Sequence, residues 1–323
     1  MKKFLIQLII FIIPVGMILV SMEVYLRQNN IYRAKKTFLD NNKQDIEALI
    51  LGPSYSWRSI NPEFLDTKTA SLAHEASAIN TNMMLFDKYA PQLPKLKYVI
   101  FDLSIGFLDT HNEENWESKH LFNIYYDIKS SNNNLEDYFL LSSNFKYYTK
   151  LCLSYITDPD NIPAFNDSGF IYKLSKQEDI FRIHEYNSER LKQADVLYRR
   201  LDYQNTINEE NYHSNIDLLK GLITYCRENK INLIFISPPK SYLNNEKIST
   251  EAITRRQKFI DDITPDPYIS FWNYENFHEQ DINLFYDDTH LNPKGAELFT
   301  KTLNRKLDNY LINRNRAEMQ SEF

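Results

Sequence analysis

The sequence predicts a three-layer α/β/α sandwich on a mostly parallel, about five-stranded sheet. Three observations carry this prediction. Short, continuous apolar runs have the pattern of strands buried on both faces. The segments between several of them carry apolar residues at helical spacing, and such a strand–helix rhythm implies a parallel sheet covered on both faces. Finally, 323 residues that are 43% hydrophobic and 25% charged can bury a substantial core.

Each strand of the predicted sheet is a short apolar stretch that ends at a turn or a polar residue. In chain order, the predicted strands cover residues 48–51, 70–73, 98–103, 233–236 and 268–271. Three helices are predicted from apolar residues spaced three or four apart. Their apolar faces are marked by Ile79, Met83 and Phe86; by Ile216, Leu219, Leu222, Ile223 and Cys226; and by Phe299, Leu303, Leu307 and Leu311.

The stretch 109–212 interrupts this rhythm and is predicted to be a helical insertion, because it is too long for an ordinary connection. It is dense in tyrosine: Tyr125, Tyr126, Tyr138, Tyr147, Tyr148, Tyr172, Tyr186 and Tyr198. One interpretation is a helical cap whose tyrosines pack a small core of its own. The other is a surface that binds an acceptor, since aromatic faces stack on sugar rings.

The first strand runs directly into Gly52-Pro53-Ser54, which would place a serine at the carboxyl edge of the sheet. Ligands of open α/β sheets bind at that edge. The chain has only six glycines, so Gly52 occupies a position where backbone geometry is expected to require it. Ser54 is therefore a candidate nucleophile. Ser56 is a rival, because Gly52-x-Ser54-x-Ser56 partly matches the Gly-x-Ser-x-Gly elbow of α/β-hydrolases, although the final glycine is missing.

A second segment, near the C-terminus, offers the partners that a nucleophilic serine needs. Asp287 and His290 lie three residues apart, so a local carboxylate–imidazole contact is expected. A histidine accepts the serine proton, and a carboxylate fixes the histidine tautomer. Asn292 is predicted as a helix N-cap and Pro293 as the first helical residue, which would hold His290 just before the last helix.

The two segments together resemble the SGNH, or GDSL-like, hydrolase superfamily. The block Gly52-Pro53-Ser54-Tyr55 stands where the family has Gly-Asp-Ser-Leu, and Asp287-Asp288-Thr289-His290 stands where it has Asp-x-x-His. Ser-x-Asn-Pro over 59–62 and His-Leu-Asn-Pro-x-Gly-Ala over 290–296 are similar to its envelope-associated branches. Those branches include O-acetyltransferases of alginate and other exopolysaccharides, and the protein that assists D-alanine transfer to teichoic acids.

The resemblance implies a catalytic serine, histidine and aspartate at Ser54, His290 and Asp287. The family's oxyanion blocks are not matched here, so the oxyanion candidates are assigned by position to the backbone N–H groups of Ser54, Ala76 and Ser77 and to the Ser104 hydroxyl. Loss of one oxyanion donor costs about 100- to 1000-fold in rate in a protease. Two residues beside the expected cleft, Tyr55 and Lys240, are candidate substrate contacts.

The apolar segment near the N-terminus predicts that the protein is attached to a membrane. Residues 4–22 are mostly apolar and follow two lysines, and their length is close to the roughly 20 residues that span a bilayer. We interpret 1–27 as an uncleaved membrane anchor, with a cleaved signal peptide as the alternative. A linker is expected over 28–44, the catalytic domain over 45–312 and a polar tail over 313–323. Flanking charges do not settle the orientation, and the resemblance favours a domain outside the cytoplasm of a bacterial-type cell.

These features predict an enzyme that moves an acyl group onto a cell-surface glycan, and the expected acyl group is acetyl. The resemblance implies a membrane-bound O-acyltransferase as a partner. An esterase of the same fold, or a catalytically idle glycan-binding or assembly subunit, remains an alternative. The net charge of −6 and the lack of a basic patch argue against nucleic acid. No metal or cofactor is expected, and Cys152 and Cys226 are expected to be free, small hydrophobic residues.

Overall fold

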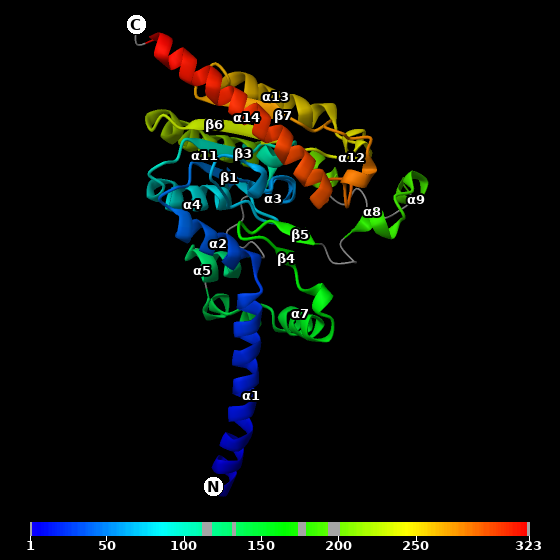
Figure 1. Ribbon diagram of the computed structural model, residues 1–323. Coiled ribbons are helices and arrows are strands. Elements are labelled where there is room, and N and C mark those ends of the chain that lie inside the picture. The colour runs from blue at the N-terminus through cyan, green and yellow to red at the C-terminus, as the bar shows by residue number, and fades with distance from the viewer. Residues whose placement is uncertain (1, 112–117, 131–133, 174–178, 193–200, 322–323) are drawn as a thin grey trace.

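A five-stranded parallel sheet forms the centre of the computed structural model, which describes residues 2–111, 118–130, 134–173, 179–192 and 201–321, with side chains as far as residue 310 (Figure 1). Its strands are β1 (Ala48–Leu51), β2 (Thr69–Ser71), β3 (Tyr98–Asp102), β6 (Asn232–Ser237) and β7 (Ile269–Asn273). Their order is β2-β1-β3-β6-β7, and every neighbouring pair is parallel. All five predicted strands are confirmed: the first has the predicted boundaries, and those of the other four differ by at most two residues.

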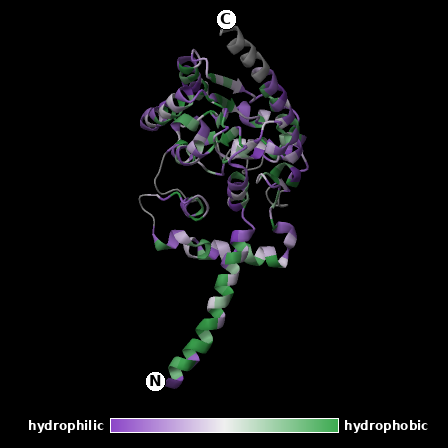
Figure 2. Cartoon of the chain, turned by 60° about the vertical axis from the view of Figure 1, so that its left-hand side comes forward, coloured by the Kyte–Doolittle hydropathy of each residue, from purple (hydrophilic) through white to green (hydrophobic). Residues whose placement is uncertain are grey.

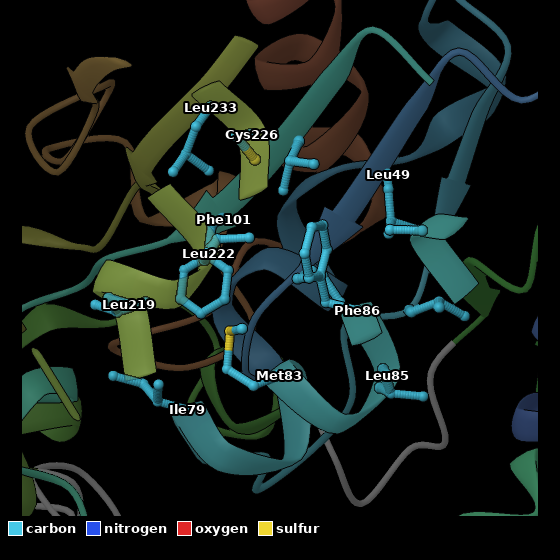
Figure 3. Close-up of a cluster of buried hydrophobic side chains, with 14 of the residues drawn as sticks. Leu49, Ile79, Met83, Leu85, Phe86, Phe101, Leu219, Leu222, Cys226 and Leu233 are labelled. Carbon is cyan, nitrogen blue, oxygen red and sulfur yellow. The ribbon is translucent and has the colours of Figure 1, made fainter. Parts of the chain in front are cut away.

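Helices cover both faces of the sheet, as predicted. The main covering helices are α4 (Ile79–Tyr89), α11 (Glu209–Glu228) and α13 (Thr250–Ile263) on one face, and α3 (Ser54–Ser59) and α14 (Pro293–Ser321) on the other. Alternate strand residues point to opposite faces. Leu49, Phe101 and Leu233 therefore pack against α4 and α11 (Figure 3), whereas Ile50, Ile100 and Ile234 belong to the cluster that contains α14.

The insertion 109–212 is largely helical, as predicted, but it also contains a short antiparallel hairpin that the sequence did not indicate. Its elements are η3 (Phe107–Asp109, at its start), α5 (Lys119–Tyr126), η4 (Leu135–Tyr138), α6 (Leu140–Ser143), α7 (Phe145–Thr157), η5 (Pro159–Asn161), β4 (Ala164–Phe165), β5 (Ile171–Lys173), α8 (Ile180–Ile183), α9 (Ser188–Lys192) and α10 (Leu201–Asn205). The remaining short helices are η1 (Pro62–Phe64), η2 (Ala90–Gln92), α12 (Tyr242–Asn245) and η6 (Ile282–Leu284).

The tyrosines of the insertion divide between the two interpretations. Tyr126 and Tyr148 are buried and pack within the protein, whereas Tyr138, Tyr147 and Tyr172 are exposed. Tyr198 lies outside the described residues, as does the side chain of Leu311. The insertion therefore has a packed interior, and only part of its tyrosine set is on the surface. Both cysteines, predicted to be free, are buried and free.

The N-terminal helix α1 (Lys2–Gln28) projects away from the domain (Figure 1). It is long and apolar enough to cross a membrane, and none of its most apolar window is buried in the protein. A signal sequence passes the same test of length and composition.

The predicted linker 28–44 contains helix α2 (Ile31–Asn42), which packs into the domain instead of standing apart from it. Tyr32 and Leu39 of α2 belong to the main core. The Tyr32 ring stacks on the buried His74 ring at 4.0 Å, and the Lys35 ammonium donates to the Ala73 carbonyl. Burial, with a smaller contribution from Arg58, lowers the pKa of Lys35 well below its usual value. Helix α2 thus connects α1 to the loop that follows β2.

Candidate active site

Ser54 is the first residue of α3, directly beyond the carboxyl end of β1. The turn that presents it depends on Gly52, whose φ of +148° is rarely adopted by residues with side chains. A Cβ at Gly52 would lie 2.4 Å from the Cβ of Asp102 at the end of β3. The Gly52 N–H donates to the Asn82 side-chain oxygen at 2.7 Å. The β1 end is therefore held between β3 and α4, with Ser54 at the sheet edge where the strand order reverses.

The structure brings the three predicted triad residues together. His290 Nε2 lies 2.8 Å from Ser54 Oγ, and His290 Nδ1 lies 2.9 Å from Asp287 Oδ2. Asp287 Oδ1 also accepts the backbone N–H groups of Thr289 and His290, each at 2.8 Å. Because an ionised carboxylate only accepts hydrogen bonds, this network assigns the imidazole proton to Nδ1. Nε2 is then left to accept the Ser54 hydroxyl proton.

The loop that carries His290 is fixed at its far end by the start of α14. The Gly295 N–H donates to the Asn292 side-chain oxygen at 3.0 Å, which is the N-cap bond expected from the sequence. The Asn292 amide donates back to the Asn283 carbonyl at 2.7 Å. A Cβ at Gly295 would lie 2.2 Å from the Leu284 carbonyl oxygen, so the helix start and η6 are in close contact.

Aromatic rings border the His290 imidazole. The Tyr286 ring is nearly parallel to it, at 5.2 Å and 9°, and the Tyr55 ring lies 5.4 Å from it. The Lys240 ammonium lies 4.6 Å from the centre of the Tyr55 ring. Lys240 is 1% exposed and is not among the residues that line the cavity beside Ser54, so its position supports Tyr55 and does not fit the predicted substrate contact. Burial lowers the pKa of Lys240, although Glu275 and Asp102 oppose this effect.

A cavity of about 480 Å³ opens beside Ser54. Its surface is mainly apolar and comes from the segments that follow β1, β2 and β3, including the starts of α3, α4 and η3, and from Tyr203 of α10. The lining residues are Pro53, Ser54, Tyr55, Glu75, Ala76, Ser77, Ala78, Asn80, Thr81, Ile105, Phe107, Thr110, His111 and Tyr203. A mainly apolar cleft with a few polar groups is typical of a small-molecule site. No group of three or more His, Cys, Asp or Glu side chains that could hold a metal is found in the described part of the chain.

The predicted oxyanion candidates separate in the structure. Ala76 and Ser77 line the same cavity as Ser54. Ala76 has a φ of +50°, in the turn between β2 and α4. The Ser77 hydroxyl donates to the Gly52 carbonyl at 2.7 Å and so joins the two loops. Ser104, in contrast, is buried outside the cavity lining. Its position corrects the expectation that its hydroxyl faces the reacting carbonyl.

Ser56, the rival nucleophile, is hydrogen-bonded to a buried carboxylate and not to the His290 imidazole. It is fully buried, and its hydroxyl donates to Asp102 Oδ2 at 2.7 Å. The Ser104 N–H donates to Asp102 Oδ1 at 2.9 Å. Burial raises the pKa of the Asp102 carboxyl, while these hydrogen bonds oppose the change. Sequence reasoning missed Asp102 and Asn82, although an aspartate ending an otherwise apolar strand at the site edge was a usable signal.

A buried ion pair lies behind the site, where β6 and β7 end. Arg256 Nη2 is 3.0 Å from Glu275 Oε2, and the Ser237 hydroxyl donates to Glu275 Oε1 at 2.7 Å. Burial alone would raise the pKa of Glu275, but the charge and hydrogen bonds of Arg256 outweigh it and lower that pKa to about 2. The backbone carbonyl of Glu275 also accepts the backbone N–H of Lys240 at 3.1 Å, so the segment after β7 is connected to the loop that carries Lys240.

Comparisons of the whole chain with known proteins gave structural similarity only. No family model matches, and no curated protein matches. Among solved structures, a "putative acylhydrolase" of Bacteroides fragilis is 9% identical, with a TM-score of 0.42, covering 88% of this chain and 98% of its own. A GDSL-like lipase of Bacteroides thetaiotaomicron is 10% identical, with a TM-score of 0.38, covering 85% of this chain and 99% of its own.

Gly52→Ala is expected to lower the free energy of unfolding by about 2–4 kcal/mol, because the new methyl group meets Asp102 and the backbone φ is strained. Urea unfolding of the detergent-solubilised protein measures it. Gly221→Ala is the control, since Gly221 is a helical glycine in α11 and the added Cβ would meet no atom within 4 Å beyond its own stretch of the helix. That control should be neutral or stabilising by about 0.5–1 kcal/mol. Equal effects of both variants would contradict this account of the turn.

Glu275→Gln is expected to lower the free energy of unfolding by about 3 kcal/mol at pH 7, because it leaves the buried Arg256 without the negative charge that it pairs with. The pKa of Glu275 is lowered in the folded state, so its stabilising effect is present above about pH 4.5 and is lost as the pH falls toward 2. The difference between the two proteins in urea unfolding should therefore shrink over that range. Glu209→Gln should have a much smaller effect, because Glu209 is exposed and its partner Arg255 keeps a second carboxylate, Asp109. A pH-independent difference would show that the charge of Glu275 is not its cause.

Proposed function

We propose that this chain is a membrane-anchored serine acyltransferase of the SGNH, or GDSL-like, type. It moves an acyl group, which we propose to be acetyl, onto a cell-surface polysaccharide. The observation that carries the proposal is the continuous hydrogen-bonded chain from Ser54 through His290 to Asp287, at the mouth of a mainly apolar cavity. A buried structural histidine does not need both a serine nucleophile and a tautomer-fixing carboxylate in line. The parallel sheet and its helices are consistent with that family.

The reaction follows from the proton positions. Ser54 Oγ attacks the acyl carbonyl carbon while its proton passes to His290 Nε2, and Asp287 stabilises the resulting imidazolium. The tetrahedral intermediate collapses when the leaving oxygen takes the proton from Nε2, which leaves the acyl group on Ser54. An acceptor hydroxyl then gives its proton to Nε2 and attacks the ester carbonyl. Collapse returns the proton to Ser54 and releases the acylated acceptor.

The backbone N–H groups of Ser54, Ala76 and Ser77 are the proposed oxyanion donors. All three residues line the cavity, and Ser54 is the first residue of α3, where backbone N–H groups are not used within the helix. Asn82 and the Ser77 hydroxyl hold the two loops together through the backbone of Gly52. The geometry of the donors is therefore set by the same contacts that position the nucleophile.

The identity of the acceptor distinguishes a transferase from an esterase. The three triad residues would act in the same way if water instead of a sugar hydroxyl attacked the acyl-enzyme. The proposal favours a glycan acceptor because α1 is suited to hold the domain at a membrane. The location outside the cytoplasm is part of the proposal and rests on the resemblance of the two sequence segments to envelope-associated enzymes. An acyl donor could be delivered there by a multispanning membrane-bound O-acyltransferase partner. The second candidate function is a carbohydrate esterase.

Acyl-enzyme formation tests the proposal. With an activated acetyl donor, intact mass of the full chain should show one acetyl addition that Ser54→Ala abolishes. Ser56→Ala should still show the addition, although it should form more slowly, since Ser56 contacts Asp102 at the start of α3 and not His290. The acylated protein is then mixed with an acetyl-free exopolysaccharide oligosaccharide. Acetylation of the sugar supports the transferase, whereas release of acetate alone supports the esterase. An addition that persists in Ser54→Ala would refute the assignment of the nucleophile.

Asp287→Asn is expected to lower kcat for a p-nitrophenyl acetate substrate by about 10³- to 10⁴-fold, because an amide favours the wrong imidazole tautomer. KM should change little, since Asp287 contacts His290 and the loop backbone. Steady-state kinetics provide the measurement, with urea unfolding to check that the loop is intact. A loss of less than tenfold in kcat in a stable variant would mean that Asp287 does not orient the base.

A further inference from the structure

A layer of short helices lies across the end of α1 where that helix enters the domain (Figure 2). We call η4, α6 and α7 (residues 135–157) the basal layer. The Glu23 carboxylate of α1 accepts the backbone N–H groups of Leu140 and Leu141, each at 2.9 Å, and Arg27 Nε pairs with the same carboxylate at 2.6 Å. The basal layer is therefore joined to α1 by directional bonds.

Apolar packing strengthens this joint and sets its level along α1. Leu26 shares a buried cluster with residues of α6 and α7, and Leu19 and Met22 pack against that cluster. The apolar side chains nearer the N-terminus, from Phe4 to Val20, are largely exposed. From Phe4 to Met22, α1 rises by about 27 Å, close to the thickness of a bilayer's hydrocarbon core. The basal layer therefore begins where the span would leave the hydrocarbon.

The basal layer also carries apolar side chains that nothing in the described structure covers. Phe145, Leu153 and Ile156 of α7 are 58%, 52% and 63% exposed. At 100° per residue they form one stripe, beside the stripe of α7 that is buried in the cluster with Leu26. Lys146 and Lys150 are exposed at the other edge of the stripe. An apolar stripe flanked by lysines is typical of a helix that lies in a membrane interface.

We infer that the basal layer is a second membrane contact, which lies in the headgroup region of the bilayer that α1 spans. The inference rests on the proposed anchoring of α1. Phe145, Leu153 and Ile156 enter the boundary of the acyl chains, and the two lysines reach lipid phosphates. A bilayer is favoured over a protein partner because the layer is attached to α1 at the level of the headgroups. The contact prevents the domain from swivelling about α1, so the cavity at Ser54 keeps a constant orientation to the membrane.

Depth-dependent fluorescence quenching tests this contact in the full chain, reconstituted into vesicles of equal parts phosphatidylcholine and phosphatidylglycerol. A fluorophore is attached to a single introduced cysteine, because native Cys152 and Cys226 are buried. Ile156→Cys reports on the basal layer and Ile12→Cys on the anchor. Ile253→Cys, 42% exposed on α13, is the control on the catalytic domain. Tyr147→Cys is a control within α7, similarly exposed but about 180° from Ile156.

We expect spin-labelled lipids to quench Ile156→Cys several-fold more than Ile253→Cys and Tyr147→Cys, most strongly with the label near the headgroup. Ile12→Cys should be quenched best by a label deep in the acyl chains. If Ile12→Cys is quenched and Ile156→Cys behaves like Ile253→Cys, the inference is overturned while the anchor stands. If Ile12→Cys is not quenched, the anchor and the inference both fall. Retained acylation by the activated acetyl donor shows that each variant is folded.

Discussion

The close contact between the ends of β1 and β3 is the constraint on which the site depends. Gly52 lies so near Asp102 that no larger residue fits, and Asp102 in turn accepts from Ser56 of α3 and from the Ser104 backbone. One buried carboxylate thus fixes the start of α3 and the loop after β3. Ser54 is the first residue of α3, so this contact contributes to its position.

The triad depends on a second fixed point, which is the start of α14. Asn292 caps that helix and holds the preceding loop, so the His290 ring can move little relative to Asp287. The sheet brings the two fixed points together, because the carboxyl ends of parallel strands share one edge. The segments at this edge therefore supply Ser54, His290 and most of the cavity wall.

Three basic side chains buried around this edge lie against an aromatic ring or a carboxylate. Lys240 lies over the Tyr55 ring, and Arg256 pairs with Glu275. Lys35 of α2 lies 5.4 Å from the Trp57 ring of α3. Burying such charges is costly unless they are compensated, so these contacts favour one arrangement of the surrounding loops. Through α2, the same network connects the site to α1 and to the basal layer.

The sequence by itself determined the five parallel strands, the segment with Ser54, the segment with Asp287 and His290, and the helix cap at Asn292. Apolar periodicity, turn residues and short-range spacing are local properties, so they can be recognised without the fold. The contact between Asp287 and His290 belongs to this group, since the two are three residues apart. Only the tertiary structure showed that Ser54 contacts His290 whereas Ser56 contacts Asp102. It also showed that Lys240 and Ser104 are buried outside the cavity lining and that α2 packs into the core. Each of these depends on residues far apart in the chain, such as Asp102 for Ser56 and Tyr32 with His74 for α2, and no local pattern encodes which of them meet.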